Sequence, residues 1–219
     1  MVSKMSTTRV QLIDKNTTVG TAAAEDTKIV FDGNAQDYHI GLDDSDDSLT
    51  IGLGSALGTT SYMNIDATGA ITKPLQPAFL VKPSSTQTDF NQGQVITIDF
   101  GTEVFDNNGD FASNTFTAPV TGRYCLQFAI QINDISNQDS ATYYYIEMAT
   151  SNRNYYNLSS IQEAVGSSAG QLYFTLSASA LADMDANDTV TCRVVMGGTS
   201  GTGPSDISNN SHFSGFLVC

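Results

Sequence analysis

The chain has 219 residues, 40% of them hydrophobic, so it can bury one core and carry a smaller additional region. Its formal net charge of −14 argues against binding to nucleic-acid phosphates or anionic membranes, because like charges repel. Nineteen of its 23 acidic residues are Asp, which favours turns, and only nine residues are Lys or Arg. With its many Thr, Ser, Asn and Gly residues, this composition predicts an all-β chain with frequent turns.

The N-terminal residues contain no apolar stretch of the kind found in a secretory signal, and no apolar run approaches the length of a membrane span. We therefore expect a protein that is made in the cytosol and is not inserted into a membrane. The three cysteines, Cys125, Cys192 and Cys219, lack the paired spacing of a zinc site. The valines on either side of Cys192 predict that it is a small buried apolar residue.

Residues 1–73 contain short β-like segments that recur about every ten residues between Asp-, Gly-, Ser- and Asn-containing turns. The predicted segments are 28–31, 38–42, 49–53, 62–65 and 70–72. Strands this short and weakly apolar cannot bury much surface within one chain. We therefore expect this region to bury its apolar side chains between chains, as a trimeric β-rich stalk or attachment segment would.

The amino-acid sequence of this region also resembles that of a known class of protein. The stretch FDGNAQDYHIGLDDSDDSLTIG at residues 31–52 and the stretch IDATGAIT at residues 65–72 resemble stalk segments of bacteriophage tail fibres. The resemblance implies a virion protein, made in the host cytoplasm, whose N-terminal region binds other virion proteins.

Two prolines mark a boundary at Lys73–Pro77, because they interrupt strand pairing and restrict their neighbours to extended conformations. We therefore divide the chain into residues 1–73 and residues 74–219. The second part contains further strand-like segments, at 77–81, 95–100, 103–109, 141–148, 171–176 and 189–196. Many short strands joined by turns predict a β-sandwich.

The clearest strand follows the turn at residues 118–122, where a proline and a glycine suit a change of direction. From Tyr124 to Asn133 the residues alternate between apolar and mostly polar. The side chains predicted to share the buried face are Tyr124, Leu126, Phe128, Ile130 and Ile132.

The stretch FASNTFTAPVTGRYCLQF at residues 111–128, answered by HFSGFLV at 212–218, resembles the globular head of complement component 1q and its tumour-necrosis-factor-like relatives. The resemblance covers residues 77–219 and implies a jelly-roll β-sandwich that forms homotrimers. Asn187 stands where these domains usually have a glycine before a strand. Asn tolerates left-handed backbone angles, so we expect that turn to be retained.

Three residues are candidates for the trimer interface. Tyr143, Tyr144 and Tyr145 point alternately to the two faces of a strand, so bulky rings on both faces indicate a subunit contact. We assign Tyr143 and Tyr145 to the interface, together with Phe216 of the closing strand. A strand at the border of a monomer is the alternative.

No cofactor is required by the sequence, but calcium has one candidate site. Asp183, Asp185, Asn187 and Asp188 alternate like the start of a calcium loop, and several complement-like heads hold calcium, so Asp183, Asp185 and Asp188 are the candidate ligands. The EF-hand pattern fails here, because its sixth and twelfth positions are Asp188 and Val194. Ordinary Asp and Asn turns are the alternative reading.

Two stretches are candidate recognition loops for a glycan or protein of a host surface. The first, at residues 151–157, combines ring faces with amide groups, and the second is the glycine-rich stretch at residues 197–204. The residues assigned to recognition are Asn152, Arg153, Tyr155, Tyr156, Ser200 and Thr202. Solvated turns without a ligand are the alternative.

With only two histidines, His39 and His212, the sequence offers little material for a nucleophilic triad, and we expect no enzyme activity. The sequence thus favours a homotrimeric virion structural protein, a bacteriophage fibre or knob that binds the host surface. A decoration or cement protein that stabilises a capsid or tail without a receptor is one alternative. A hydrolase acting on surface polysaccharide is another.

Overall fold

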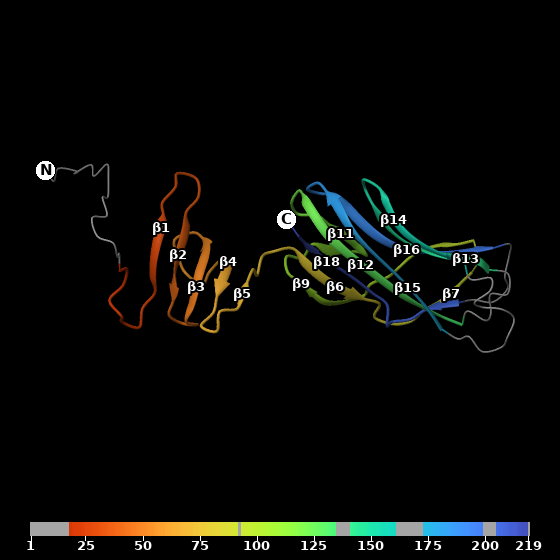
Figure 1. Ribbon diagram of the computed structural model, residues 1–219, viewed down its shortest axis with the longest axis horizontal. Helices are drawn as coiled ribbons and strands as arrows, with labels where there is room; N and C mark the ends of the chain where they lie inside the picture. The colour runs from red at the N-terminus through yellow and green to blue at the C-terminus, as the bar shows by residue number, and fades with distance from the viewer. Residues whose placement is uncertain (1–17, 92, 135–140, 161–172, 199–204, 219) are drawn as a thin grey trace. The chain divides into compact units, whose positions relative to one another are not determined.

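The computed structural model of the chain describes residues 18–91, 93–134, 141–160, 173–198 and 205–218 (Figure 1). All secondary-structure elements assigned in these residues are strands, which confirms the predicted all-β class. Within the described residues, no helix is long and apolar enough to span a bilayer. The chain divides into two compact units, Met1–Pro74 and Leu75–Cys219.

The first unit contains one antiparallel sheet in which each strand pairs with the next along the chain (Figure 1). Its strands are β1 (Thr27–Phe31), β2 (Tyr38–Asp43), β3 (Ser48–Leu53), β4 (Ser61–Ile65) and β5 (Ile71–Thr72). They coincide with the five predicted segments to within two residues, since the Asp- and Gly-rich turns between them were visible in the sequence.

The second unit consists of two antiparallel sheets. The strands of the first, which we call the β12 sheet, are β6 (Ala78–Lys82), β7 (Gln87–Phe90), β9 (Thr102–Asp106), β12 (Gly122–Asn133), β15 (Tyr173–Met184), β17 (Ser205–Ile207) and β18 (His212–Leu217). They are arranged in the order β7-β17-β12-β18-β6-β9, and β15 also pairs with β12. The strands of the second, which we call the β16 sheet, are β8 (Val95–Thr97), β10 (Phe111–Ala112), β11 (Thr115–Thr117), β13 (Ala141–Thr150), β14 (Asn154–Ser160) and β16 (Thr189–Gly198). They are arranged in the order β10-β11-β16-β13-β14, and β8 also pairs with β16.

The strand β12 has the predicted alternation, with Tyr124, Leu126, Phe128, Ile130 and Ile132 all essentially inaccessible to solvent. It also pairs with β18 as predicted, with Phe128 opposite Phe213. The Tyr124 hydroxyl donates to the carbonyl oxygen of Val120 at 2.8 Å, so its one polar group is satisfied in the turn before the strand. Asn187 has a φ of 75°, which confirms the left-handed residue expected before β16.

Aromatic rings form the centre of the core between the two sheets. The Phe79 ring lies 4.6 Å from Phe116 and 5.5 Å from Phe111, both in the β16 sheet. Its centroid is also 5.0 Å from that of Phe213 in its own sheet. Phe79 is therefore the ring that joins the two layers.

Several boundaries differ from the sequence prediction. The strands β7, β14 and β17 were not predicted, since β7 and β14 consist mostly of polar or exposed residues and β17 has only three residues, although Ser205 and Ile207 are buried. The segment predicted at 95–100 forms strand only over Val95–Thr97, although Ile98 and Phe100 are buried in the core. The segment predicted to end at Leu176 continues as β15 to Met184, because small and polar residues follow the full length of β12.

Candidate interaction surfaces of the jelly-roll head

The outer face of the β16 sheet carries a group of apolar side chains that we call the tyrosine surface. The register places Leu158, Tyr145, Val195 and Val95 in one row across β14, β13, β16 and β8. Tyr143 lies beside this row, with its ring 6.2 Å from that of Tyr145 and nearly parallel to it at 13°. The residues of the tyrosine surface are Val95, Tyr143, Tyr145, Tyr156, Leu158 and Val195.

Apart from Val195, which is only 7% exposed, these side chains are partly or largely exposed in a monomer. Tyr156 is 67% exposed and Leu158 56% exposed. Tyr144, between the two predicted interface tyrosines, points into the core, and burial raises its pKa to about 12. Partial burial, followed by the nearby negative charge of Glu147, also raises the pKa of Tyr145. The alternation predicted for this strand is thus confirmed, whereas the contact of Tyr143 and Tyr145 with another subunit stays a prediction.

The outer face of the β12 sheet carries a second group, the Phe216 surface. Leu181, Cys125, Phe216 and Ala78 stand opposite one another across β15, β12, β18 and β6. Leu80 and Phe105 continue the group on β6 and β9, and Val104 lies beside them. The residues of the Phe216 surface are Ala78, Leu80, Val104, Phe105, Cys125, Leu181 and Phe216.

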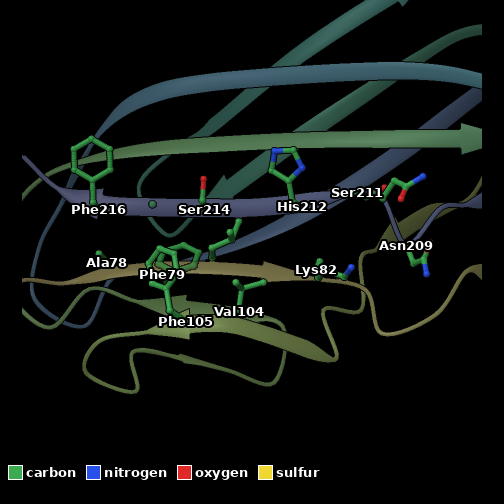
Figure 2. Close-up of a pocket in the computed structure, with 13 residues that line it drawn as sticks. Ala78, Phe79, Lys82, Val104, Phe105, Asn209, Ser211, His212, Ser214 and Phe216 are labelled. Carbon is green, nitrogen blue, oxygen red and sulfur yellow. The ribbon is translucent and has the colours of Figure 1, made fainter.

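Part of the Phe216 surface is hollowed. The hollow has a volume of about 570 Å³ and is lined by residues of β6, β9 and β18 together with Asn209, Asn210 and Ser211 (Figure 2). Figure 2 shows Phe216 at one end of the row on β18 and the polar His212 towards the other end. Phe216 itself is 48% exposed and Phe105 46% exposed. The hollow therefore offers an apolar socket bordered by polar groups.

A third feature joins two groups that the sequence analysis treated separately. Asn152 and Arg153 lie in the turn between β13 and β14, and they contact the aspartates at the end of β15 and in the following turn. The Arg153 guanidinium donates to Asp183 Oδ2 at 2.7 Å, and Asn152 Nδ2 donates to Asp188 Oδ2 at 2.7 Å. The same Asp188 accepts from the Ser151 hydroxyl at 2.8 Å.

These contacts give the predicted calcium ligands a role within the fold. Asp188 also accepts from the backbone N–H of Asp185 at 2.8 Å, and Asp185 Oδ1 accepts from the Thr121 hydroxyl at 3.4 Å. The described residues contain no group of three His, Cys, Asp or Glu side chains placed to hold a metal ion. Binding of calcium by Asp183, Asp185 and Asp188 therefore stays a prediction, beside this observed use of the same carboxylates.

Replacing Asp188 with alanine should loosen the turn at residues 151–153, because three donors would lose their acceptor. The bond from the Asp185 N–H, followed by that from Ser151, lowers the pKa of the Asp188 carboxyl. Its contribution is therefore present above the unfolded pKa, about 3.9, and is lost as the pH falls through the lower folded value. At matched pH, the protection factors for amide hydrogen exchange in residues 150–154 should be lower in Asp188→Ala than in the wild type, and those of the wild type should fall below that pH.

Calcium provides the contrasting outcome in the same experiment. If the aspartates bind calcium, millimolar calcium should slow exchange in the wild type and leave Asp188→Ala unchanged. Equal exchange with calcium and with magnesium is the expected result for carboxylates used as hydrogen-bond acceptors.

The predicted recognition residues are divided by the structure. Asn152 and Arg153 lie in a turn, as expected, but Tyr155 and Tyr156 lie in the strand β14, which corrects their assignment to a loop. Tyr155 packs against the core and its hydroxyl is 3.4 Å from Asp183, whereas Tyr156 belongs to the tyrosine surface. Ser200 and Thr202 lie outside the described residues.

The match to a family model decides which family this fold belongs to. The model of the C1q domain matches residues 78–218, which include every strand of the two sheets. The chain belongs to the C1q domain family. This C1q domain carries both candidate interaction surfaces and the Asp183–Asp188 turn, and the family match confirms the resemblance on which the jelly-roll prediction rested.

The solved structures that the chain is similar to are more distant. The globular domain of the zebrafish complement 1qA protein is 18% identical, over 66% of this chain and 98% of that one, with a TM-score of 0.42. Murine APRIL, crystallised at pH 5.0, is 12% identical over 65% of this chain and 98% of its own, with a TM-score of 0.44. A search of curated proteins found no match.

Domains of the C1q and tumour-necrosis-factor-like class are typically trimeric and generally non-enzymatic. His39 lies in the N-terminal sheet with Nδ1 3.0 Å from the Gly54 oxygen, and His212 begins β18 in the C1q domain. Residues 166–170 have the Gly-x-Ser-x-Gly spacing of a hydrolase nucleophile but lie outside the described residues.

Proposed function

We propose that the protein is a non-enzymatic homotrimeric virion protein, a bacteriophage fibre or knob whose C1q domain binds the host surface. The observation that carries the proposal is the pair of exposed apolar surfaces on the two sheets of the C1q domain. Their side chains are too numerous and too well ordered by the register to be scattered surface residues, and exposed patches of this kind mark contact sites.

Two different surfaces suit a ring. In a cyclic trimer each subunit presents one surface to one neighbour and a different surface to the other, so the contacts close without a free end. Tyr143 and Tyr145 are in the β16 sheet, whereas Phe216 is in the β12 sheet. The two groups are therefore suited to meet each other across a subunit boundary, with tyrosine and phenylalanine rings at its centre.

Recognition of the host belongs, in this proposal, to polar groups outside the two surfaces. Asn152 and Arg153 are exposed and are held by Asp183 and Asp188, so their positions are fixed before any ligand arrives. Amide and guanidinium groups suit a neutral glycan or a protein. Three copies add avidity, since weak contacts made together bind more tightly than one. The net charge of −14 disfavours nucleic acid as the ligand.

The virion assignment is supported by the N-terminal region, whose sequence of short strands and turns resembles that of tail-fibre stalks. We assign to this unit the attachment to other virion proteins. Purified phage particles whose genome encodes this chain provide the test. We expect antibodies against the C1q domain to label the end of a fibre and to block adsorption to host cells.

The other outcomes of this experiment separate the rival functions. Labelling of the capsid or tail tube with unchanged adsorption would support a decoration protein in place of a fibre. Cleavage of host polysaccharide by the pure protein would support a hydrolase. Absence of the protein from the particle would overturn the virion assignment altogether.

A further inference from the structure

The N-terminal sheet has one apolar and one polar face, and the apolar face is the one that is exposed to solvent in a single chain. Residues that stand opposite each other in neighbouring strands share a face, and the register places Ile29, Ile40, Ile51 and Met63 in one row across β1 to β4. The side chains on this face are Thr27, Ile29, Phe31, Tyr38, Ile40, Leu42, Leu49, Ile51, Leu53, Met63, Ile65 and Ile71. We call it the apolar face.

The opposite face is polar and is covered within the chain. It carries His39, Asp43 and Thr50, each at most 7% exposed. The segment after β3 covers it, since the Gly54 carbonyl oxygen accepts from His39 Nδ1 at 3.0 Å and Leu57 is buried. The small core of this single sheet is therefore built on the side that carries the polar residues.

The apolar face, by contrast, is exposed to solvent in a single chain. Phe31 is 60% exposed, Leu42 54% and Ile71 61%. None of the described strand residues on this face is charged, although the chain as a whole has a net charge of −14. A contiguous apolar face of this extent marks an interface, because soluble monomers rarely expose one.

We propose that this face is covered by the same face of two further copies of the chain, so that three sheets enclose one apolar core around a threefold axis. The inference rests on the trimer of the proposed function. A C1q domain of a typically trimeric class follows the sheet in the same chain, so a trimer of that domain would hold three sheets at high local concentration.

The chemistry of the face also selects the occupant. A face without charge offers no ion pair to a partner of different composition, whereas an identical sheet offers the same aliphatic side chains in return. Sheets pack face to face at about 10 Å through interdigitating side chains of this type. The three copies thus supply one another with a core that the short strands lack individually.

The test uses the full-length protein and two matched substitutions. Leu42→Asp places a charge on the apolar face, and Thr72→Asp places the same charge on the other face, at an exposed position opposite Asn64. Leu42 is already 54% exposed in one chain, so the sheet of a single subunit should tolerate the change. The readouts are the mass in analytical ultracentrifugation and hydroxyl-radical oxidation of Phe31.

In the wild type we expect a trimer in which Phe31 is oxidised about tenfold more slowly than a side chain of its 60% exposure should be. Leu42→Asp should restore fast oxidation while the C1q domains keep the trimer together, and Thr72→Asp should behave like the wild type. A wild-type trimer with rapidly oxidised Phe31 would overturn this inference and leave the proposed trimer intact. A monomeric wild type would overturn both.

A third result points to another occupant. If Phe31 is oxidised rapidly in the pure trimer but slowly in assembled particles, a different virion protein covers the face, and the inference of a shared core is wrong.

Discussion

Substituting Phe79 with alanine should remove a large part of the stability of the C1q domain. The ring contacts Phe116 and Phe111 of one sheet and Phe213 of the other, with centroids 4.6–5.5 Å apart. Truncating a buried Phe costs about 3–5 kcal/mol, because the lost contacts leave a cavity. Domains are typically stable by only about 5–15 kcal/mol, so the midpoint of chemical denaturation should fall sharply.

Tyr173→Ala is the control, because it removes a ring from a side chain that is 59% exposed and belongs to neither interaction surface. Its effect on the free energy of unfolding of the monomer should stay within about 1 kcal/mol. Similar losses from both substitutions would mean that Phe79 does not join the two sheets as described.

Substituting Phe216 with aspartate should dissociate the trimer. The charge would enter an apolar row between Cys125 and Ala78, where no described neighbour in that row offers a positive partner. In analytical ultracentrifugation the species should change from three times 23.3 kDa towards 23.3 kDa at micromolar concentration. Tyr143→Asp should have the same effect, because a ring uses both surfaces of every subunit.

Val120→Asp is the control for these substitutions. Val120 is 46% exposed, similar to Phe216, but lies in the connection before β12 and in neither surface. It should remain trimeric. A wild-type chain that sediments as a monomer, or a trimer that survives both Phe216→Asp and Tyr143→Asp, would contradict the assigned interface.

Local patterns were enough to predict much of the fold. In β12 the period of two identified the buried residues correctly, since one face of the strand meets the core and the other does not. In β13 the same reasoning separated the buried Tyr144 from Tyr143 and Tyr145. The five N-terminal strands were predicted because each is bounded by Asp- or Gly-containing turns.

Features that depend on register could not be predicted. The row formed by Leu181, Cys125, Phe216 and Ala78 brings together four strands that are far apart in the sequence. Nothing local to Leu181 indicates its neighbours, because a shift of one residue would turn it to the other face. Burial of apolar side chains between chains was expected for the N-terminal region, but the side chains that share its apolar face were known only from the register of the strands.

The candidate site shows the same division. Asp183, Asp185 and Asp188 were selected from their spacing, and Asn152 and Arg153 from the polarity of their turn. Sequence gave no reason to connect residues about thirty positions apart, whereas the fold brings Arg153 to 2.7 Å from Asp183. The strand β14 was missed because its polar residues looked like part of that turn.

The pairing of β6 with β18 has a consequence for synthesis of the protein. Ala78 stands opposite Phe216 and Val81 opposite Phe213. The first strand of the C1q domain therefore cannot complete its pairing until the last strand has been synthesised. A nascent chain on the ribosome can form the hairpins of the N-terminal sheet early. The free edge of β6 stays available to other nascent chains until β18 has been translated. Premature stop codons before His212 should therefore yield insoluble polypeptide and no folded, shortened C1q domain.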